Sequence, residues 1–410
     1  MKKKKDILIL CQYFYPEYVS SATLPTDLAE DLVDKGLTVD VLCGYPKEYY
    51  DGEPVKTKEL YKGLTINRVK YTEFNNKSTL GRLINFFSFF ISILFKLPYL
   101  FKYKSIIVYS NPPILPLIPY FVSCISKTKF VFVAFDIYPD NALKSGSIKK
   151  GGIIEKIMNY INKRVYKHAS RVVAISNDMK QYMIRENLSL NAGNIDVIPN
   201  WYNKDKVEQK KTIGNTEFKK LKEDWPLIVL YSGNMGTLQD METILECLKL
   251  MMNRKDVFFM FTGHGNKAEY VKNYINSNGI NNAKVYGFLL GQDYKDVLNI
   301  ADVCLVSLAE GIEGLGVPSK TYGYLAAGKP VLAIMSDETD IACDLSKYNA
   351  GGNVSQGDYK GLERLILNYL NNPKQINTSG INARKLFNER YERVVCTNQY
   401  YRMITKVINK

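Results

Sequence analysis

The feature that most constrains this fold is a strand–loop–helix–strand unit within residues 7–42. Residues 7–11 form a short apolar run that predicts a buried strand, and Leu24, Leu28 and Leu32 then recur at helical spacing. Gly36 predicts the end of that helix, and residues 37–42 predict the next strand. A strand, a helix and a second strand in this order form a βαβ unit, so the sequence predicts a parallel sheet.

The same alternation continues along the chain in two sets. Further strands are predicted at 64–71, 105–110, 129–135, 171–175 and 195–198, and a second set is predicted at 227–231, 257–261, 285–288, 303–306 and 331–334. Between the sets, residues 203–224 are polar and lysine-rich without a clear period, which predicts a linker. Because 410 residues are too many for one ordinary core, we expect two α/β domains.

Residues 314–330 predict a phosphate-binding element in the second half. A Gly- and Pro-containing loop leads into a short predicted helix, which Gly328 ends before the strand at 331–334. The start of a helix presents free backbone N–H groups and a partial positive charge. With Ser319 placed to cap that helix and Lys320 in its first turn, the stretch could hold a diphosphate. The alternative is a tight connection whose glycines serve only the turn.

Two glycine turns favour the phosphate interpretation. Gly233–Gly236 and Gly263–Gly265 each follow a predicted strand, where a backbone without side chains can approach a ligand closely. Together with the Lys320 element they indicate a nucleotide site. Neither turn is followed about 20 residues later by the acidic residue that a dinucleotide fingerprint requires. In the first half, Asp136 and Asp140 follow the predicted strand 129–135, at the sheet edge where ligands collect, and are candidates for contacting hydroxyls.

Charge and apolar patterning point to an anionic partner. The net charge is +14, and residues 51–200 carry 22 Lys/Arg against 10 Asp/Glu. Residues 83–101 form the longest apolar run, with Asn85, Ser88, Ser92 and Lys96 in one narrow polar stripe. We favour a helix lying on the cytoplasmic membrane face, with a buried helix as the equal alternative. Lys96 and Pro98 cut the run too short for a span.

Several classes of protein are excluded by composition. The seven cysteines are scattered without a C-x-x-C pair, which indicates a reducing compartment and no disulfide framework. Two histidines without ligand spacing argue against a zinc site. The apolar run at 7–11 is too short for a signal peptide, so we expect no export. The basic stretch has no recognisable nucleic-acid motif, so no nucleic-acid partner is expected.

An ordered series of motifs resembles the family 4 glycosyltransferases. The series is YFYPE (13–17), DKGLTVDVL (34–42), NPP (111–113), DIYPD (136–140), AISNDM (174–179), VIPNWYN (197–203), YSGNMG (231–236), FTGHG (261–265) and VPSKTYGYLAAGKPVLA (317–333). It is most similar to the bacterial branch of polysaccharide and O-antigen assembly, which includes L-fucosamine and colanic-acid transferases. The resemblance implies the GT-B fold, two Rossmann-like doubly wound parallel-sheet domains facing across a cleft.

The resemblance also implies domain boundaries and site residues. Residues 1–200 would hold the acceptor, 201–226 would be the linker, 227–385 would hold the donor, and 386–410 would be a C-terminal helix packing back on the first domain. Lys320 and Asp136 would be the catalytic residues. The donor would be bound by Gly233, Asn234, Gly263, His264, Gly265, Glu313, Gly316, Val317, Pro318, Ser319 and Tyr322. The acceptor would be bound by Tyr15, Glu17, Ser20, Ser21 and Asp140.

Three departures from the family pattern stand out. Many relatives carry a ribose-binding Glu where this chain has Gly323, and Glu310 or Glu313 could replace it. The Arg and Lys that relatives often carry after the first strand of the second domain are Asn234 and Gln239 here, which places more weight on Lys320. The His that precedes the family's acidic residue is Phe135.

The resemblance thus implies a retaining glycosyltransferase that needs no metal or other cofactor. It would use a nucleotide sugar, with uracil as the favoured base and GDP open, and an undecaprenyl-diphosphate-linked saccharide. It would work as a peripheral protein at the inner face of the cell membrane, bound to anionic lipid through 83–101. Two alternatives remain: a soluble nucleotide-sugar epimerase of the same fold, and a non-catalytic scaffold of a polysaccharide assembly complex.

Overall fold

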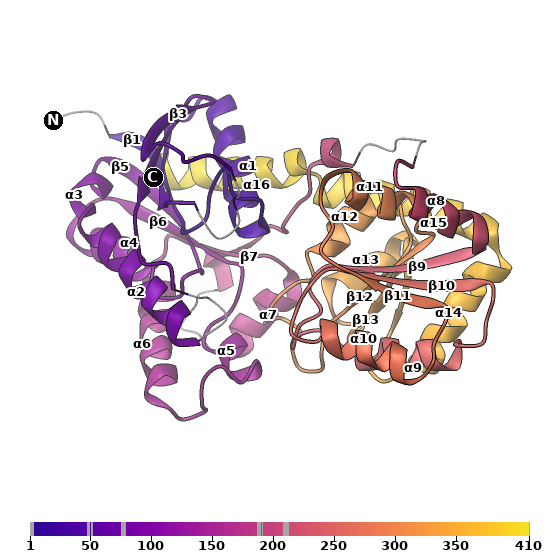
Figure 1. Ribbon diagram of the computed structural model, residues 1–410. Coiled ribbons are helices and arrows are strands. Elements are labelled where there is room, and N and C mark those ends of the chain that lie inside the picture. Colours follow the sequence, from indigo (N-terminus) through magenta and orange to yellow (C-terminus); the bar gives the residue numbers. More distant parts are fainter. Residues whose placement is uncertain are drawn as a thin grey trace. The chain divides into compact units, whose positions relative to one another are not determined.

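The computed structural model describes residues 4–46, 50, 52–74, 79–186, 190, 192–207 and 213–409. The chain divides into two compact units (Figure 1). Unit 1 comprises residues 1–199, 314–316 and 396–410, and unit 2 comprises residues 200–313 and 317–395. Each unit is built around one sheet, so the expectation of two parallel-sheet α/β domains is confirmed.

Among the described residues, eight strands form the sheet of unit 1, in the order β3-β4-β2-β1-β5-β6-β7-β8. Their bounds are β1 (Lys5–Leu10), β2 (Val39–Gly44), β3 (Lys58–Tyr61), β4 (Leu64–Val69), β5 (Tyr103–Tyr109), β6 (Lys129–Ala134), β7 (Arg171–Ala174) and β8 (Ile195–Val197). All neighbouring pairs are parallel except β3 and β4. The apolar run Ile7–Leu10 is fully buried, as expected for a central strand covered on both faces.

Helices of unit 1 connect these strands and cover the sheet. They are α1 (Ser20–Asp34), α2 (Thr79–Leu94), α3 (Leu97–Leu100), α4 (Leu117–Ile125), α5 (Asp140–Lys144), α6 (Ile153–His168), α7 (Asn177–Arg185) and η1 (Ala192–Asn194). The last helix, α16 (Arg393–Asn409), joins this unit from Cys396 onward. It buries Cys396, Tyr400 and Ile404 almost completely, so its apolar side belongs to the core of unit 1.

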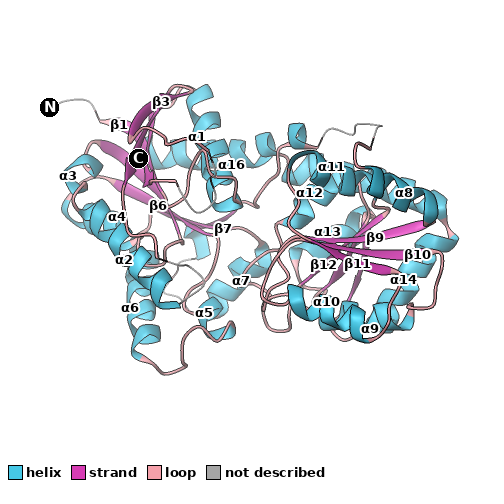
Figure 2. Cartoon of the chain, in the orientation of Figure 1, coloured by secondary structure: helices cyan, strands magenta, loops and turns pink. Residues whose placement is uncertain are grey.

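Unit 2 contains a parallel sheet of six described strands, in the order β11-β10-β9-β12-β13-β14. The strands are β9 (Leu227–Ser232), β10 (Val257–Thr262), β11 (Ala283–Tyr286), β12 (Val303–Ser307), β13 (Val331–Ile334) and β14 (Gly351–Val354). The helices are η2 (Lys204–Lys206), α8 (Thr216–Asp224), α9 (Glu242–Leu250), α10 (Ala268–Ser277), α11 (Gly291–Ile300), α12 (Lys320–Ala326), α13 (Asp340–Tyr348), α14 (Tyr359–Asn371), α15 (Pro373–Leu386) and η3 (Phe387–Tyr391). Figure 2 shows α8 and α11 on one face of this sheet and α9 and α10 on the other.

The structure differs from the predicted linker at 201–226. Residues 216–224 form the helix α8, and the segment belongs to unit 2. Asn215 caps this helix, because its side-chain oxygen accepts hydrogen bonds from the amides of Glu217 and Phe218. Phe218 is the buried residue of α8, and one apolar contact is too little to produce a visible helical period. The antiparallel partner of β4, strand β3, was also not predicted.

The predicted helix at 83–101 is two helices, α2 and α3, and α2 presents its polar stripe to the protein. Asn85 exchanges hydrogen bonds with the backbone of Phe74, Ser88 bonds to the amide of Thr72, and Ser92 bonds to the carbonyl of Lys70. The outward side of α2 is apolar instead. Its exposed stripe is Leu80, Ile84, Phe87, Ile91 and Leu94, with exposed fractions between 36% and 69%.

Within the described residues, no helix combines the length and the apolar character that crossing a membrane requires.

Candidate functional site

Two interlocked glycine loops stand at the carboxyl ends of neighbouring strands in unit 2. Strands β9 and β10 pair in parallel, with Ser232 beside Thr262. The loops that follow are joined by backbone hydrogen bonds. The amide of Gly233 donates to the carbonyl of Thr262 at 2.9 Å, and the amide of Met235 donates to the carbonyl of His264 at 2.7 Å. The predicted residues Gly233, Asn234, Gly263, His264 and Gly265 therefore lie together.

Glycine is required where these loops meet. Gly263 has φ +127°, and a Cβ placed on it would lie 2.0 Å from the carbonyl oxygen of Gly233. Gly265 has φ +133°, and its Cβ would lie 2.3 Å from the carbonyl oxygen of Met235. Both the left-handed backbone and the close approach exclude any side chain at these two positions.

The loops also leave backbone donors available. Among the described residues, the amides of Asn234, His264 and Gly265 have no hydrogen-bond partner. Backbone N–H groups in a glycine-rich loop at a strand end are a common means of holding phosphate oxygens. The loops can therefore donate to an anionic ligand.

Lys320, in the first turn of α12, reaches the same loops. Its ammonium lies 3.6 Å from the centre of the Tyr231 ring and donates to the carbonyl of Asn234 at 3.3 Å. A Cβ on Gly233 would lie 3.2 Å from Cε of Lys320, so the side chain passes directly over that glycine. Tyr324, one turn later on α12, holds the strand end, because its hydroxyl donates to the carbonyl of Ser232 and accepts from its amide.

The environment of Lys320 favours its neutral form. The side chain as a whole is half-buried, but desolvation of its ammonium lowers the pKa of Lys320 to about 7. Desolvation acts this way because a low-dielectric surrounding disfavours the charged form. An anion bound beside Lys320 would favour the charged form and raise the pKa again.

The other residues predicted to bind the sugar donor differ from one another in their exposure to solvent. Ser319 stands at the N-cap position of α12, as predicted, but it has helical dihedral angles (φ −59°, ψ −21°), and its exposed side chain makes no capping bond. Tyr322 is only 1% exposed, and its ring centre lies 4.8 Å from that of Tyr391. Tyr322 is therefore a core residue rather than a contact to the sugar donor. Pro318 is buried and Val317 is half-buried.

Glu313 and Gly316 stand at the division between the units. Glu313 accepts a hydrogen bond from Gln356 at 2.7 Å, whereas Glu310 is exposed. Residues 314–316 belong to unit 1, where a Cβ on Gly316 would lie 3.9 Å from Oδ1 of Asp136. At Gly323, where the sequence resemblance implies a ribose contact, a Cβ would lie 3.3 Å from the Tyr294 hydroxyl and 3.6 Å from the Tyr202 ring. Two tyrosines therefore surround this glycine.

In unit 1, Asp136 follows the carboxyl end of β6, as predicted. The side-chain amide (Nδ2) of Asn141 donates to Oδ1 of Asp136 at 2.8 Å, and the hydroxyl of Ser110 accepts from the backbone amide of Asp136 at 3.1 Å. Burial raises the pKa of Asp136 to about 6. Asp140 is the first residue of α5, and burial also raises its pKa.

The remaining predicted acceptor residues lie at the carboxyl end of β1. Tyr15 is partly exposed and stacks on Tyr61 with ring centres 4.1 Å apart. Ser20 and Ser21 are the first two residues of α1, and Ser20 is exposed. Glu17 is 4% exposed, so its carboxylate is not on the surface.

Sequence reasoning missed Tyr231, Tyr324 and Asn141. Tyr324 stands four residues after Lys320, on the same face of one helix, so spacing alone could have identified it. Asn141 follows Asp140 directly, but its bond to Asp136 depends on the turn into α5. Nothing in the sequence indicates that the Tyr231 ring lies under Lys320, because the two residues are 89 positions apart.

Two family models match this chain. Residues 22–206 match the model "Glycosyltransferase Family 4", and residues 213–386 match the model "Glycosyl transferases group 1". Together they cover most of the chain, with the first match in the N-terminal half and the second in the C-terminal half.

Among curated relatives, the chain is 31% identical over 243 residues to the probable glycosyltransferase WbjE of Pseudomonas aeruginosa. That match covers 58% of this chain and 59% of WbjE, so it spans less than two thirds of the relative. A protein of Escherichia coli (strain K12) named "Putative colanic acid biosynthesis glycosyl transferase WcaI" is 24% identical over 338 residues, 78% of this chain and 81% of that protein.

A solved structure, HepE of Anabaena in complex with UDP and glucose, has a TM-score of 0.70 at 15% identity. The alignment covers 98% of this chain and 100% of HepE, which establishes the same fold. The N-terminal half of the chain therefore matches the family 4 glycosyltransferases, its C-terminal half matches the group 1 glycosyl transferases, and the chain has the GT-B fold.

Proposed function

We propose that this protein transfers a sugar, with retention of configuration, from a UDP-linked donor to a lipid-linked saccharide during synthesis of a surface polysaccharide. The observation that carries the proposal is the position of Lys320 beside the free amides of Asn234, His264 and Gly265. This arrangement provides a cation and backbone donors for the two phosphates of a nucleotide sugar.

Chemically, the group that leaves in such a transfer is a nucleoside diphosphate, on which negative charge develops. Preorganised N–H groups and a cation next to that charge stabilise the transition state. In our proposal Lys320 and the loop amides perform this role without a metal ion. Asp136 would hold the acceptor hydroxyl in unit 1, where Asn141 fixes its carboxylate.

The relatives support the substrate classes. HepE was solved with UDP and with UDP-glucose, and WcaI carries the name of a colanic acid transferase. A further structural neighbour is WaaG, a glycosyltransferase of lipopolysaccharide biosynthesis. These proteins make a uridine nucleotide the first donor class to test. Their names support surface-polysaccharide synthesis, and the lipid-linked acceptor is our proposal.

The test is a thermal-shift panel of nucleoside diphosphates and nucleotide sugars with the full chain. A ligand that binds only the folded state raises stability by about 2.7 kcal/mol at 100 times its dissociation constant. We expect uridine compounds to raise the Tm and other bases to have little effect. The absence of a Tm shift with every compound would contradict the proposal. A shift with guanine compounds alone would mean that the donor carries guanine rather than uracil. Release of the nucleoside diphosphate in the presence of lipid-linked acceptor then measures transfer.

Proton uptake on donor binding is a second prediction. Because the pKa of free Lys320 is about 7, most molecules carry a neutral amine at pH 8. A bound diphosphate raises this pKa, so binding at pH 8 should take up a proton, to at most about one per site. Calorimetry of UDP binding in Tris and in HEPES should give different observed enthalpies. The difference should be smaller at pH 6, where Lys320 is already charged, and absent in Lys320→Met. Equal wild-type enthalpies at pH 8 would contradict it.

We also propose that unit 1 binds the cytoplasmic face of an anionic membrane through the apolar stripe of α2. The stripe is contiguous, because residues 80, 84, 87, 91 and 94 recur at helical spacing and all are exposed. Lys96 and Lys102, also exposed, follow the carboxyl end of α2 in the chain and add positive charge. Apolar residues beside basic ones are the composition of helices that lie at an anionic lipid surface.

Replacing two residues of the stripe tests this surface. The variant Phe87→Asp/Ile91→Asp should bind vesicles of phosphatidylglycerol and phosphatidylethanolamine at least about tenfold more weakly, since each side chain contributes about 1.5 kcal/mol or more when buried. Leu250→Asp, at an exposed leucine of unit 2, serves as the control and should bind like wild type. Equal sedimentation of the double variant and wild type would exclude α2 as the contact.

A further inference from the structure

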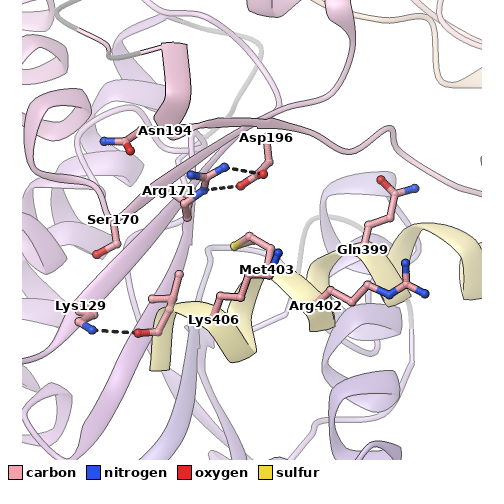
Figure 3. Close-up of a pocket in the computed structure, with 10 residues that line it drawn as sticks. Lys129, Ser170, Arg171, Asn194, Asp196, Gln399, Arg402, Met403 and Lys406 are labelled. Atoms are coloured by element: carbon pink, nitrogen blue, oxygen red, sulfur yellow. Dashed lines mark hydrogen bonds and ion pairs between the residues drawn. The ribbon is translucent and has the colours of Figure 1, made fainter. Parts of the chain in front are cut away.

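A cavity of about 420 Å³ lies in unit 1 at the amino ends of β6, β7 and β8, with α16 along its side (Figure 3). Lys129 and Arg171 begin β6 and β7, and Asp136 follows the opposite end of β6. The cavity therefore stands at the sheet edge opposite the proposed acceptor residues. Its volume is within the range of sites for small ligands.

The lining carries more positive than negative charge. Four cationic side chains, Lys129, Arg171, Arg402 and Lys406, line it against one carboxylate, Asp196. Arg171 is neutralised by Asp196, which accepts from its Nε at 2.5 Å and from its Nη2 at 2.6 Å. Lys129 donates to the carbonyl of Val407 at 2.9 Å, a partner that carries no net charge. Three positive charges thus remain without a counter-charge at the cavity.

Two of these cations have no partner. Among the described residues, neither Arg402 nor Lys406 forms a side-chain hydrogen bond or ion pair, and both are exposed. They stand four residues apart on α16, so they share one face, where like charges repel each other. The position near the end of the helix offsets part of this repulsion. A bound anion would remove it.

Neutral hydrogen-bonding groups complete the lining. The side chains of Ser170, Asn194 and Gln399 border the cavity and, within the described part of the chain, have no hydrogen-bond partner. Figure 3 shows the Arg171–Asp196 pair and Asn194 on one side and the residues of α16 on the other. Five side chains with unused donors therefore border one cavity.

We propose that this cavity is a second ligand site of the protein, separate from the donor and acceptor sites, and that it binds the phosphate group of a small phosphorylated molecule. Arg402, Lys406 and Lys129 supply the positive charge, since phosphate oxygens accept charge-assisted hydrogen bonds from such groups. Ser170, Asn194 and Gln399 donate to the oxygens or hydroxyls of the rest of the ligand.

The experiment compares two matched double variants of the full chain. Arg402→Gln/Lys406→Gln removes the unpaired cations, and Lys163→Gln/Lys167→Gln makes the same change at two exposed lysines, also four residues apart, on α6. Inorganic phosphate, ribose 5-phosphate and glucose 1-phosphate are titrated by calorimetry. We expect binding to wild type, the α6 variant and Lys320→Ala. The α16 variant should bind at least about tenfold more weakly.

Vesicles identify the source of the phosphate. Vesicle binding is therefore measured in the Phe87→Asp/Ile91→Asp background, where α2 no longer contributes. Binding to vesicles containing phosphatidic acid that the α16 substitutions abolish, together with weak binding of glucose 1-phosphate, would assign the site to a lipid headgroup. Tight binding of the soluble esters would assign it to a free metabolite. Equal affinities of wild type and the α16 variant, or no binding of any phosphate probe, would overturn the proposal. The Lys320→Ala control separates this result from failure of the donor site.

Discussion

Replacing Lys320 by alanine is expected to lower kcat/KM for the nucleotide sugar by about 10²–10³-fold. The reason is that a preorganised charge next to the leaving group contributes about 3–4 kcal/mol to the transition state. Here Lys320 has added weight, because the two positions where the sequence resemblance implies further cations are Asn234 and Gln239 in this chain. Release of the nucleoside diphosphate in the presence of acceptor measures the effect.

Two further variants separate charge from fold in that experiment. Lys320→Arg keeps the charge but changes its shape, and we expect it to recover part of the activity. Tyr231→Leu removes the ring that lies 3.6 Å from the ammonium and should weaken donor turnover while Lys320 remains present. If Lys320→Ala kept wild-type activity with a normal Tm, Lys320 would not be the group that neutralises the diphosphate.

Replacing Gly263 by alanine is expected to destabilise unit 2 by about 3 kcal/mol or more. A non-glycine residue at φ +127° costs about 1–3 kcal/mol, and a Cβ only 2.0 Å from the Gly233 carbonyl forces the two loops apart at further cost. Because both tryptophans, Trp201 and Trp225, belong to unit 2, their fluorescence during urea unfolding reports on this unit.

Gly287 provides the matched control for that variant. Its carbonyl accepts from the amide of Gly263, yet a Cβ on Gly287 would meet no atom within 4 Å, and its φ lies outside the left-handed region. Gly287→Ala should shift stability by less than about 0.5 kcal/mol. Equal urea midpoints for Gly263→Ala and Gly287→Ala would show that the loops separate without cost.

The elements that the sequence predicts well are those that a local pattern determines. The fully buried strands are apolar runs, the glycine loops follow them directly, and Gly328 ends α12 with φ +65°. Ser176, directly before α7, caps that helix, because its side chain accepts from the backbone amide of Met179 at 3.2 Å. In each case the determining residues are within a few positions of one another.

The errors concern contacts between distant residues. The polar stripe of α2 is visible in the sequence, but its orientation depends on bonds to residues 70–74, which no period reveals. Tyr322 is in the core because it meets Tyr391, 69 positions later. Ser319 is at the predicted N-cap position but makes no capping bond, because it already has helical dihedral angles. The same limit applies to the cavity beside α16, whose lining residues come from four separate segments of the chain.

The return of α16 to unit 1 has a consequence for exchanging halves between relatives. Unit 1 is not one continuous stretch of the gene, since residues 1–199 and 396–410 both contribute to it. A fragment ending at Pro199 would lack Tyr400, Met403, Ile404 and Val407, which are buried in the intact chain. Its sheet would lose the cover that they provide. A chimera designed to combine one relative's acceptor specificity with another's donor specificity must therefore have two crossovers, so that α16 is inherited together with the N-terminal half.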